Sequence, residues 1–142
     1  MKISNKKAHF EYKLEQDKFE AGISLSGGEA KAVRCGHADL SRSVARVVGG
    51  EIFLINANIP IIGAKNYTAT RMRKLLLHKN EIVSVSTKMK QFKLTLVPVS
   101  IYNKGRLIKL GLALGRPRHK FEKKETIKRK DIEREINREL KN

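Results

Sequence analysis

Residues 94–115, LTLVPVSIYNKGRLIKLGLALG, hold the clearest structural pattern in the chain. The stretch Leu94–Tyr102 is rich in apolar and β-branched residues, which favour a strand, and Asn103-Lys104-Gly105 is typical of a turn. The apolar residues that follow the turn recur at every second position: Ile108, Leu110, Leu112 and Leu114. This period of two predicts a strand with one buried face, and Pro98 predicts a sheet edge or a bulge. The stretch therefore predicts a β-hairpin.

Two further regions, closer to the N-terminus, also favour strands. Gly49-Gly50 separates the apolar runs Val44–Val48 and Glu51–Asn58, which predicts a second tight hairpin. Residues 11–25 form another extended segment, and residues 59–70 form an irregular connection. Antiparallel hairpins interrupted by short helices predict a small α+β protein, mainly β, with a barrel-like antiparallel sheet.

Two helices are predicted in the body of the chain. Ser26 and Glu29 have the spacing of a capping box, so a short helix begins there and ends at Gly36. Apolar residues at roughly helical spacing predict a longer helix from about Thr70 to Phe92. The basic residues of this longer helix form either a solvated face or a phosphate-binding face: Arg71, Arg73, Lys74 and Lys79, with His78 among them.

The two ends of the chain are polar. Residues 1–8 are predicted to be loosely held. After residue 115 the chain contains no glycine, charge is dense, and Ile132, Ile136 and Leu140 recur every four residues, which predicts a helix from about 122 to 141. Its apolar stripe is only one residue wide, too narrow to anchor it in a core. We therefore expect a domain over 1–115 and a basic tail over 116–142 that is disordered alone and helical on a partner.

The net charge of the 142-residue chain predicts a polyanionic partner. The sequence contains 31 Lys and Arg against 14 Asp and Glu, a net charge of +17. The tail holds 11 of the basic and 6 of the acidic residues, so the tail carries +5 and the domain carries +12. The domain itself is therefore expected to dock on nucleic acid. The alternative is a generally basic surface without a partner. A membrane association is not predicted, because no apolar stretch is long enough to span a bilayer.

No catalytic, metal or cofactor site is predicted. The four histidines are scattered at positions 9, 37, 78 and 119, and no phosphate-cradling glycine loop is present. His37 and Asp39 are more typical of a polar turn than of a catalytic pair. The single cysteine, Cys35, excludes an intrachain disulfide and suits the reducing cytoplasm. We expect Cys35 to face the core rather than to be exposed and reactive.

Five blocks along the chain together resemble one family. They are NKKAHFEY (5–12), EAGISLSGGEAKAVRCG (20–36), RKLLLHKNEI (73–82), LGLALG (110–115) and FEKKETIKRKD (121–131). In this order they are similar to small protein B (SmpB), the tmRNA-binding or SsrA-binding proteins of bacteria. The resemblance implies an oligonucleotide-binding-like β-barrel with flanking short helices. It also implies a cytoplasmic monomer without a cofactor and without enzymatic activity.

The resemblance also implies a role in trans-translation. Such a protein binds the tRNA-like domain of tmRNA and delivers it to ribosomes stalled without a stop codon, while its tail occupies the empty mRNA channel near the decoding region of the small subunit. Two other classes fit the basic composition, namely a structural ribosomal RNA-binding protein and a small nuclease. The first would stay on subunits through a high-salt wash, and the second would cleave tmRNA in the presence of Mg²⁺.

Carried over residue by residue, the resemblance implies ten tmRNA-binding positions. They are Asn5, Lys7, Glu20, Gly22, Lys31, Arg34, Leu76, His78, Lys79 and Lys109. Without the family, Glu20 would be read as a surface residue paired with Lys18, and Leu76 as a core residue. In the tail, the ribosome-contacting positions are Arg116, His119, Phe121, Lys123, Lys124, Lys128 and Arg129. Either Phe121 or His119 would stack on a ribosomal base, and Phe121 is the preferred candidate.

Overall fold

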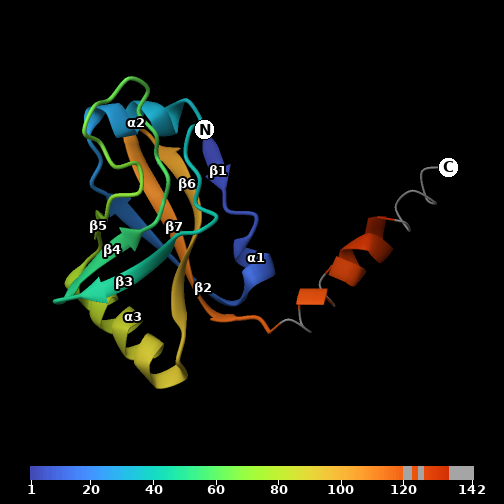
Figure 1. Cartoon of the computed structure of the whole chain (residues 1–142). Helices are drawn as coiled ribbons and strands as arrows, with labels where there is room; N and C mark the ends of the chain where they lie inside the picture. The colour runs from blue at the N-terminus through green and yellow to red at the C-terminus, as the bar shows by residue number, and fades with distance from the viewer. Residues whose placement is uncertain (120–122, 125–126, 135–142) are drawn as a thin grey trace.

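The computed structural model describes residues 1–119, 123–124 and 127–134. Figure 1 shows a sheet flanked by helices, with residues 127–134 lying away from it. The elements in chain order are β1 (Lys2–Ser4), α1 (Ala8–Glu11), β2 (Tyr12–Ile23), α2 (Gly27–Arg34), β3 (Val44–Val48), β4 (Glu51–Ile55), β5 (Arg73–Leu76), α3 (Lys79–Phe92), β6 (Thr95–Lys104) and β7 (Leu107–Pro117).

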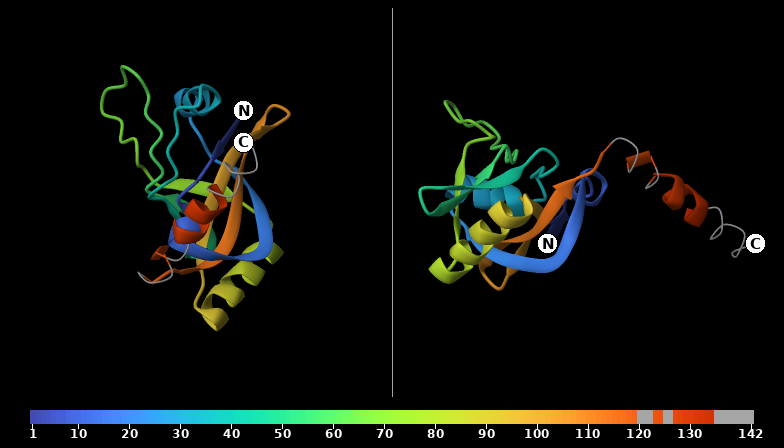
Figure 2. Two further views of the ribbon diagram at one scale, coloured as in Figure 1. Left: turned by 90° about the vertical axis from the view of Figure 1, so that its right-hand side faces the viewer. Right: turned by 90° about the horizontal axis from the view of Figure 1, so that it is seen from below.

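The seven strands form one antiparallel sheet that closes on itself. Their order is β1-β6-β3-β4-β5-β2-β7, and an additional pairing joins β7, the last strand of this series, to β6, the second. The strands β6, β3, β4, β5, β2 and β7 therefore form a ring, and β1 pairs with β6 beside it. The long strand β6 also pairs with β1 through residues 100–102 and with β3 through Leu96. The closed ring is visible from two further directions in Figure 2. The predicted fold, mainly antiparallel β with short helices, is confirmed.

The hairpin predicted from residues 94–115 forms the largest part of the sheet. Strands β6 and β7 pair over nine positions, from Thr95 opposite Gly115 to Lys104 opposite Leu107. Gly105 takes the turn with a φ of 63°, a conformation that side chains disfavour. The register shifts between Pro98 and Ser100, which confirms the predicted bulge. The hairpin at Gly49-Gly50 is also confirmed as β3 and β4.

The core lies inside this ring, and the two longer helices cover its ends. Strands contribute fully buried apolar side chains such as Leu54, Leu96 and Leu110, each of which contributes roughly 1.5–3 kcal/mol by leaving water. The helices α2 and α3 lie at opposite ends of the sheet in Figures 1 and 2, and each inserts a fully buried valine, Val33 and Val85, into the same core.

The helix predicted from Thr70 is wrong over its first part. Residues 73–76 form strand β5, and the helix α3 begins only after His78, whose main-chain N–H donates to the Glu81 carboxylate at 3.4 Å. Burial alternates along β5, with Arg73 and Leu75 inside and Lys74 and Leu76 outside. Pairing with both β4 and β2 satisfies the main chain of this segment, a requirement that local apolar spacing does not reveal.

The N-terminal residues are also more ordered than the sequence predicted. Lys2–Ser4 pair with β6, and Asn5 is 6% exposed. The Asn5 side-chain amide donates to the main-chain oxygens of Leu40 at 3.1 Å and Pro98 at 2.8 Å. These two bonds fasten the N-terminal segment to the sheet, so the expectation that residues 1–8 are loose is wrong.

The tail continues from β7, which runs two residues past Gly115 to Pro117. Residues 127–134 are helical, within the range for which a helix was predicted. The remainder of that predicted helix at 122, 125–126 and 135–141 lies outside the described residues. Within the described ranges, no helix combines the length and the apolar character needed to cross a membrane.

Candidate RNA-binding surface

Three of the predicted RNA-binding residues lie in one row across the outside of the sheet. Leu76 of β5 is the register partner of Gly22 in β2, and Gly22 is in turn the partner of Lys109 in β7. Paired residues in a sheet direct their side chains to the same face, so the three positions form one surface. Leu76 is 54% exposed, which excludes the core role that the sequence had left open for it.

Gly22 keeps this row flat. A Cβ atom placed on Gly22 would lie 3.2 Å from the Cβ of Leu76, a tighter approach than side chains normally make. A glycine at this position therefore leaves the Leu76 side chain undisturbed and lets a ligand approach the main chain of β2.

Glu20 lies two residues before Gly22, on the same outer face. Its carboxylate accepts a short hydrogen bond from the Tyr102 hydroxyl and an ion-pair hydrogen bond from Lys104 Nζ at 3.0 Å. The interpretation of Glu20 without the family, a surface residue paired with Lys18, is therefore wrong. Hydrogen bonds from Tyr102 and Lys104 lower the pKa of Glu20, so it is ionised at neutral pH. Burial, together with the bond to Glu20, raises the pKa of Tyr102 to about 12.

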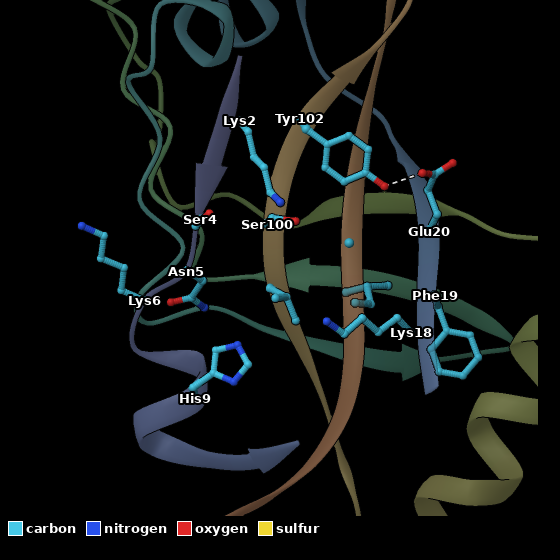
Figure 3. Close-up of a pocket in the computed structure, with 13 residues that line it drawn as sticks. Lys2, Ser4, Asn5, Lys6, His9, Lys18, Phe19, Glu20, Ser100 and Tyr102 are labelled. Carbon is cyan, nitrogen blue, oxygen red and sulfur yellow. Dashed lines mark hydrogen bonds between the residues drawn. The ribbon is translucent and has the colours of Figure 1, made fainter. Parts of the chain in front are cut away.

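A groove of about 520 Å³ runs beside Glu20 on this face (Figure 3). Its floor includes the small residues Ser100 and Gly111. Basic side chains come from both sides of the groove, Lys2, Lys6 and His9 from the N-terminal segment and Lys18 from β2. A groove with a small-residue floor and a cationic border suits a polyanionic chain that needs close approach.

Helix α2 brings two further predicted residues near the row. Lys31 and Arg34 are exposed on α2, and Arg34 Nη2 donates to the main-chain oxygen of Arg106 in the β6–β7 turn at 3.1 Å. A second hollow of about 300 Å³ lies between α2 and the sheet, and it is lined in part by Gly22, Arg34, Leu76 and Lys109. The structure thus brings these four predicted residues together.

The other predicted residues lie apart from this row. Asn5 lines the groove but is buried, and its Oδ1 atom has no hydrogen-bond partner among the described residues. Lys7 is exposed where α1 begins, and His78 and Lys79 are exposed where α3 begins. The outer-face surface is therefore built around Glu20, Gly22, Leu76 and Lys109, with additional cations at its edges.

A buried ionic network lies behind this surface, and the sequence did not reveal it. Glu29 and Arg73 are both 0% exposed, and Arg73 Nε donates to Glu29 Oε2 at 2.7 Å. Arg71 donates to both carboxylate oxygens, and the Tyr67 hydroxyl donates to Oε2 at 2.9 Å. Arg73, predicted as part of an exposed basic helix, is instead the ion-pair partner of Glu29.

The network joins α2 to the connection between β4 and β5. Arg73 also donates to the main-chain oxygens of Ala57 and Ala69, each at 2.8 Å. The capping box predicted from Ser26 and Glu29 is confirmed, since the Ser26 N–H donates to Glu29 at 2.9 Å and the Glu29 N–H to Ser26 Oγ at 3.2 Å. Burial would raise the pKa of Glu29, but the bonds from Arg71, Ser26, Arg73 and Tyr67 outweigh it and lower the pKa to about 2.

The described tail positions are mostly exposed. Arg116 lies in β7 opposite Lys13, and His119 follows the strand. Lys123 Nζ forms an ion pair with Glu11 at 2.6 Å. Three further predicted tail residues are exposed, namely Lys124, Lys128 and Arg129. Phe121 lies outside the described residues.

Cys35 is exposed, so the expectation that it faces the core is wrong. It follows the last residue of α2, whose buried face ends with Ala32 and Val33. In the part of the chain that the structure describes, no group of three or more His, Cys, Asp or Glu side chains is placed to hold a metal ion.

Comparisons with known proteins agree on one family. The family model of the SmpB protein matches residues 2–142. The chain is 40% identical to the SsrA-binding protein of Dehalococcoides mccartyi over 141 residues, covering 97% of this chain and 81% of that protein. It is 42% identical to the SsrA-binding protein of Halalkalibacterium halodurans over 140 residues, covering 96% and 90%.

A solved structure agrees with these relatives. It is described as "tmRNA-SmpB: a journey to the center of the bacterial ribosome", and one of its chains superposes with a TM-score of 0.67 at 37% identity. The match covers 84% of this chain and 85% of that one. The sequence blocks, the closed antiparallel sheet and these matches lead to one conclusion: the chain belongs to the SmpB family of SsrA-binding proteins.

Proposed function

We propose that this protein binds tmRNA and acts in trans-translation, delivering the tRNA-like domain of tmRNA to ribosomes that have stalled without a stop codon. The observation that carries the proposal is the outer-face row of Leu76, Gly22 and Lys109, beside a groove with a cationic border, in a chain of the SmpB family. Folded RNA is recognised largely by shape and by contacts to phosphate and ribose, which a rigid basic surface provides.

In this proposal the ten predicted positions contribute in three ways. The exposed cations Lys7, Lys31, Arg34 and Lys79 and the half-buried Lys109 contact phosphates, whereas Glu20, Gly22, Leu76 and His78 contact bases or ribose. Asn5 contributes by fastening the N-terminal segment beside the groove, because its side-chain amide donates to two main-chain oxygens.

The tail is proposed to act on the ribosome rather than on tmRNA. It is basic, and the apolar side chains of Ile127 and Ile132 on its described helical part are both exposed. Such a segment gains stability only on a partner, and the mRNA channel of the small subunit is lined by RNA. The two functional units remain 1–115 and 116–142, although strand pairing continues to Pro117.

The protein is proposed to work as a monomer in the cytoplasm, with tmRNA and the ribosome as partners and without a cofactor or catalytic activity of its own. Gel-shift titration tests the central claim. Binding to the tRNA-like domain should be tight and should weaken steeply with salt, since each phosphate contact releases counterions. Equal affinity for any structured RNA of the same length would contradict the proposal.

The division of labour between domain and tail has a separate test. A chain that ends after His119 keeps all of β7 and the Arg118 N–H bond to the Glu11 main-chain oxygen. It should bind the tRNA-like domain as the full chain does but should support no tagging on stalled ribosomes. Loss of RNA binding in this variant would contradict the division.

A further inference from the structure

Glu20 is an unusual residue for a surface that binds RNA. A carboxylate repels phosphate, and this one lines the same groove as Lys2, Lys6 and Lys18. Because its pKa is lowered, it is ionised at neutral pH, and an ionised carboxylate only accepts hydrogen bonds. A ligand in contact with Glu20 must therefore present N–H or O–H donors.

Two residues of β6, in the neighbouring β6–β7 hairpin, hold the Glu20 carboxylate in place. Tyr102 donates to Oε2 and Lys104 donates to Oε1, so each carboxylate oxygen has one fixed partner. Tyr102 lies on β6 and Glu20 on β2, with β7 between them. Figure 3 shows the Tyr102 side chain reaching across β7 to the carboxylate.

Gly111 makes this reach possible. It is the register partner of Glu20 on β7, and a Cβ atom there would lie 3.6 Å from Cε1 of Tyr102 and 2.9 Å from Oγ of Ser100. Because Gly111 has no side chain, Tyr102 can cross β7 to reach Glu20, and the floor of the groove is not filled at this position.

The carboxylate keeps capacity for a ligand. Two carboxylate oxygens offer about four acceptor sites, and Tyr102 and Lys104 take one on each oxygen. The remaining sites form a pair of adjacent acceptors in a fixed orientation. Guanine is the standard base whose Watson–Crick edge presents two adjacent N–H donors, at N1 and at the 2-amino group. Adenine and cytosine each present a single amino group.

The groove is suited to the rest of such a nucleotide. Its volume of about 520 Å³ lies in the range of small-ligand sites, and it is too small for a duplex. Lys2, Lys6 and Lys18 form no ion pair with any described residue and are available for phosphate. Unpaired bases are the parts of a folded RNA that proteins read directly.

Building on the proposed function, we propose that this groove receives one unpaired guanine of the bound RNA, whose N1–H and 2-amino groups donate to Glu20. Tyr102 and Lys104 are positioning residues that hold the carboxylate for this contact. The surface thereby gains base selectivity that its lysines cannot supply, since phosphate contacts carry no sequence information.

The test combines protein variants with single-atom changes in the RNA. Each unpaired guanosine of the tRNA-like domain is replaced in turn by inosine, which lacks the 2-amino group. At one position the replacement should weaken binding roughly ten- to a hundredfold, the scale of one hydrogen bond to a charged group. Glu20→Gln should weaken binding of the unmodified RNA by at least about as much, and in Glu20→Gln the inosine at that position should have no further effect.

Tyr102→Phe tests the positioning role. It should weaken binding several-fold without changing the salt dependence, because no phosphate contact is lost, and this loss should disappear in the Glu20→Gln background. Tyr12→Phe is the matched control, because the Tyr12 hydroxyl makes no hydrogen bond to the described residues. Circular dichroism of each variant establishes that it is folded.

The outcomes separate the two proposals. If inosine and Glu20→Gln weaken binding independently at every position, or if 2′-deoxy substitution is the change that couples to Glu20, the guanine proposal is wrong while tmRNA binding stands. If the unchanged protein has no preference for the tRNA-like domain, the proposed function itself fails.

Discussion

Two glutamates nine residues apart, Glu20 and Glu29, each combine a tyrosine with basic partners yet lie in opposite environments. Glu20 is on the outer face with 37% of its side chain exposed, and Glu29, in the first turn of α2, is fully buried. Among the residues that the structure describes, Glu29 accepts from four, namely Ser26, Tyr67, Arg71 and Arg73, whereas Glu20 accepts from two, Tyr102 and Lys104. A carboxylate whose acceptor sites are filled serves the fold, and one with sites remaining can serve a ligand.

The difference follows from the cost of burial. An ionised carboxylate inside a protein requires partners on every acceptor site, because water cannot reach it. A carboxylate at the surface keeps water on its free sites, and a ligand can displace that water. The four predictions below test this contrast, beginning with the largest expected effect.

Arg73→Ala should destabilise the protein by about 3–5 kcal/mol, because it leaves a buried carboxylate without its fully buried partner. Urea denaturation followed by circular dichroism measures the free energy of unfolding. Lys74→Ala is the matched control: Lys74 is the next residue in β5, and its ion pair with Glu51 is about half exposed on both sides. The control should change stability by less than about 1 kcal/mol. Equal effects at both positions would contradict the structural role of the network.

Acidification should remove the contribution of Glu29. Its folded-state pKa of about 2 lies below the ordinary value of 4.5, so the stabilisation is present above pH 4.5 and is lost as the pH falls toward 2. The shift corresponds to roughly 3 kcal/mol. Denaturation curves at stepped pH should show this loss in the natural chain and a shallower dependence in Glu29→Gln. An identical pH dependence in both proteins would show that another group is responsible.

Glu20→Ala should lower RNA affinity and leave stability nearly unchanged, whereas Arg73→Ala should mainly lower stability. Stability should change little, because the ion pair with Lys104 is exposed to solvent and screened by it. Affinity for the tRNA-like domain should fall roughly tenfold or more, the equivalent of about 1.4 kcal/mol. Fluorescence anisotropy with labelled RNA and a thermal melt of the same sample measure both quantities. A large drop in melting temperature with unchanged affinity would reverse the assignment of the two glutamates.

Gly22→Ala should have the smallest effect. The added methyl group would press on Leu76 at 3.2 Å and move it by a few tenths of an ångström, which should lower RNA affinity a few-fold with little loss of stability. Gly27→Ala is the control, since a Cβ there meets nothing within 4 Å. It should leave RNA affinity unchanged. Weaker binding in the control alone would place the contact on α2 instead of on β2.

Much of the local structure could be predicted from the sequence. The period of two in residues 107–114 and the turn at Gly105 act between near neighbours, and the capping box depends on a separation of three residues. The resemblance to the family also identified Glu20, Gly22, Leu76 and Lys109, which the structure brings to one face. The sequence could not decide whether Leu76 is exposed, because the residues around it are compatible with a helix as well as with a strand.

The partners of the two glutamates could not be predicted. Arg71 and Arg73 are separated from Glu29 by 42 and 44 residues, and Tyr102 is separated from Glu20 by 82. Nothing in the local pattern distinguishes Arg73, which is buried, from Lys74, which is exposed. The role of Tyr67 could not be predicted either, because Tyr67 lies in a connection without regular periodicity.

The sequence by itself determined the hairpins, the capped helix, the division of charge into +12 and +5, and the family. The tertiary structure alone decided which charged residues face inward, which carboxylate is saturated, and where the groove lies. The physical reason is how far apart along the chain the interacting residues lie. Turn, cap and strand patterns depend on neighbours along the chain, whereas burial and ionic pairing depend on strands that meet only when the sheet closes.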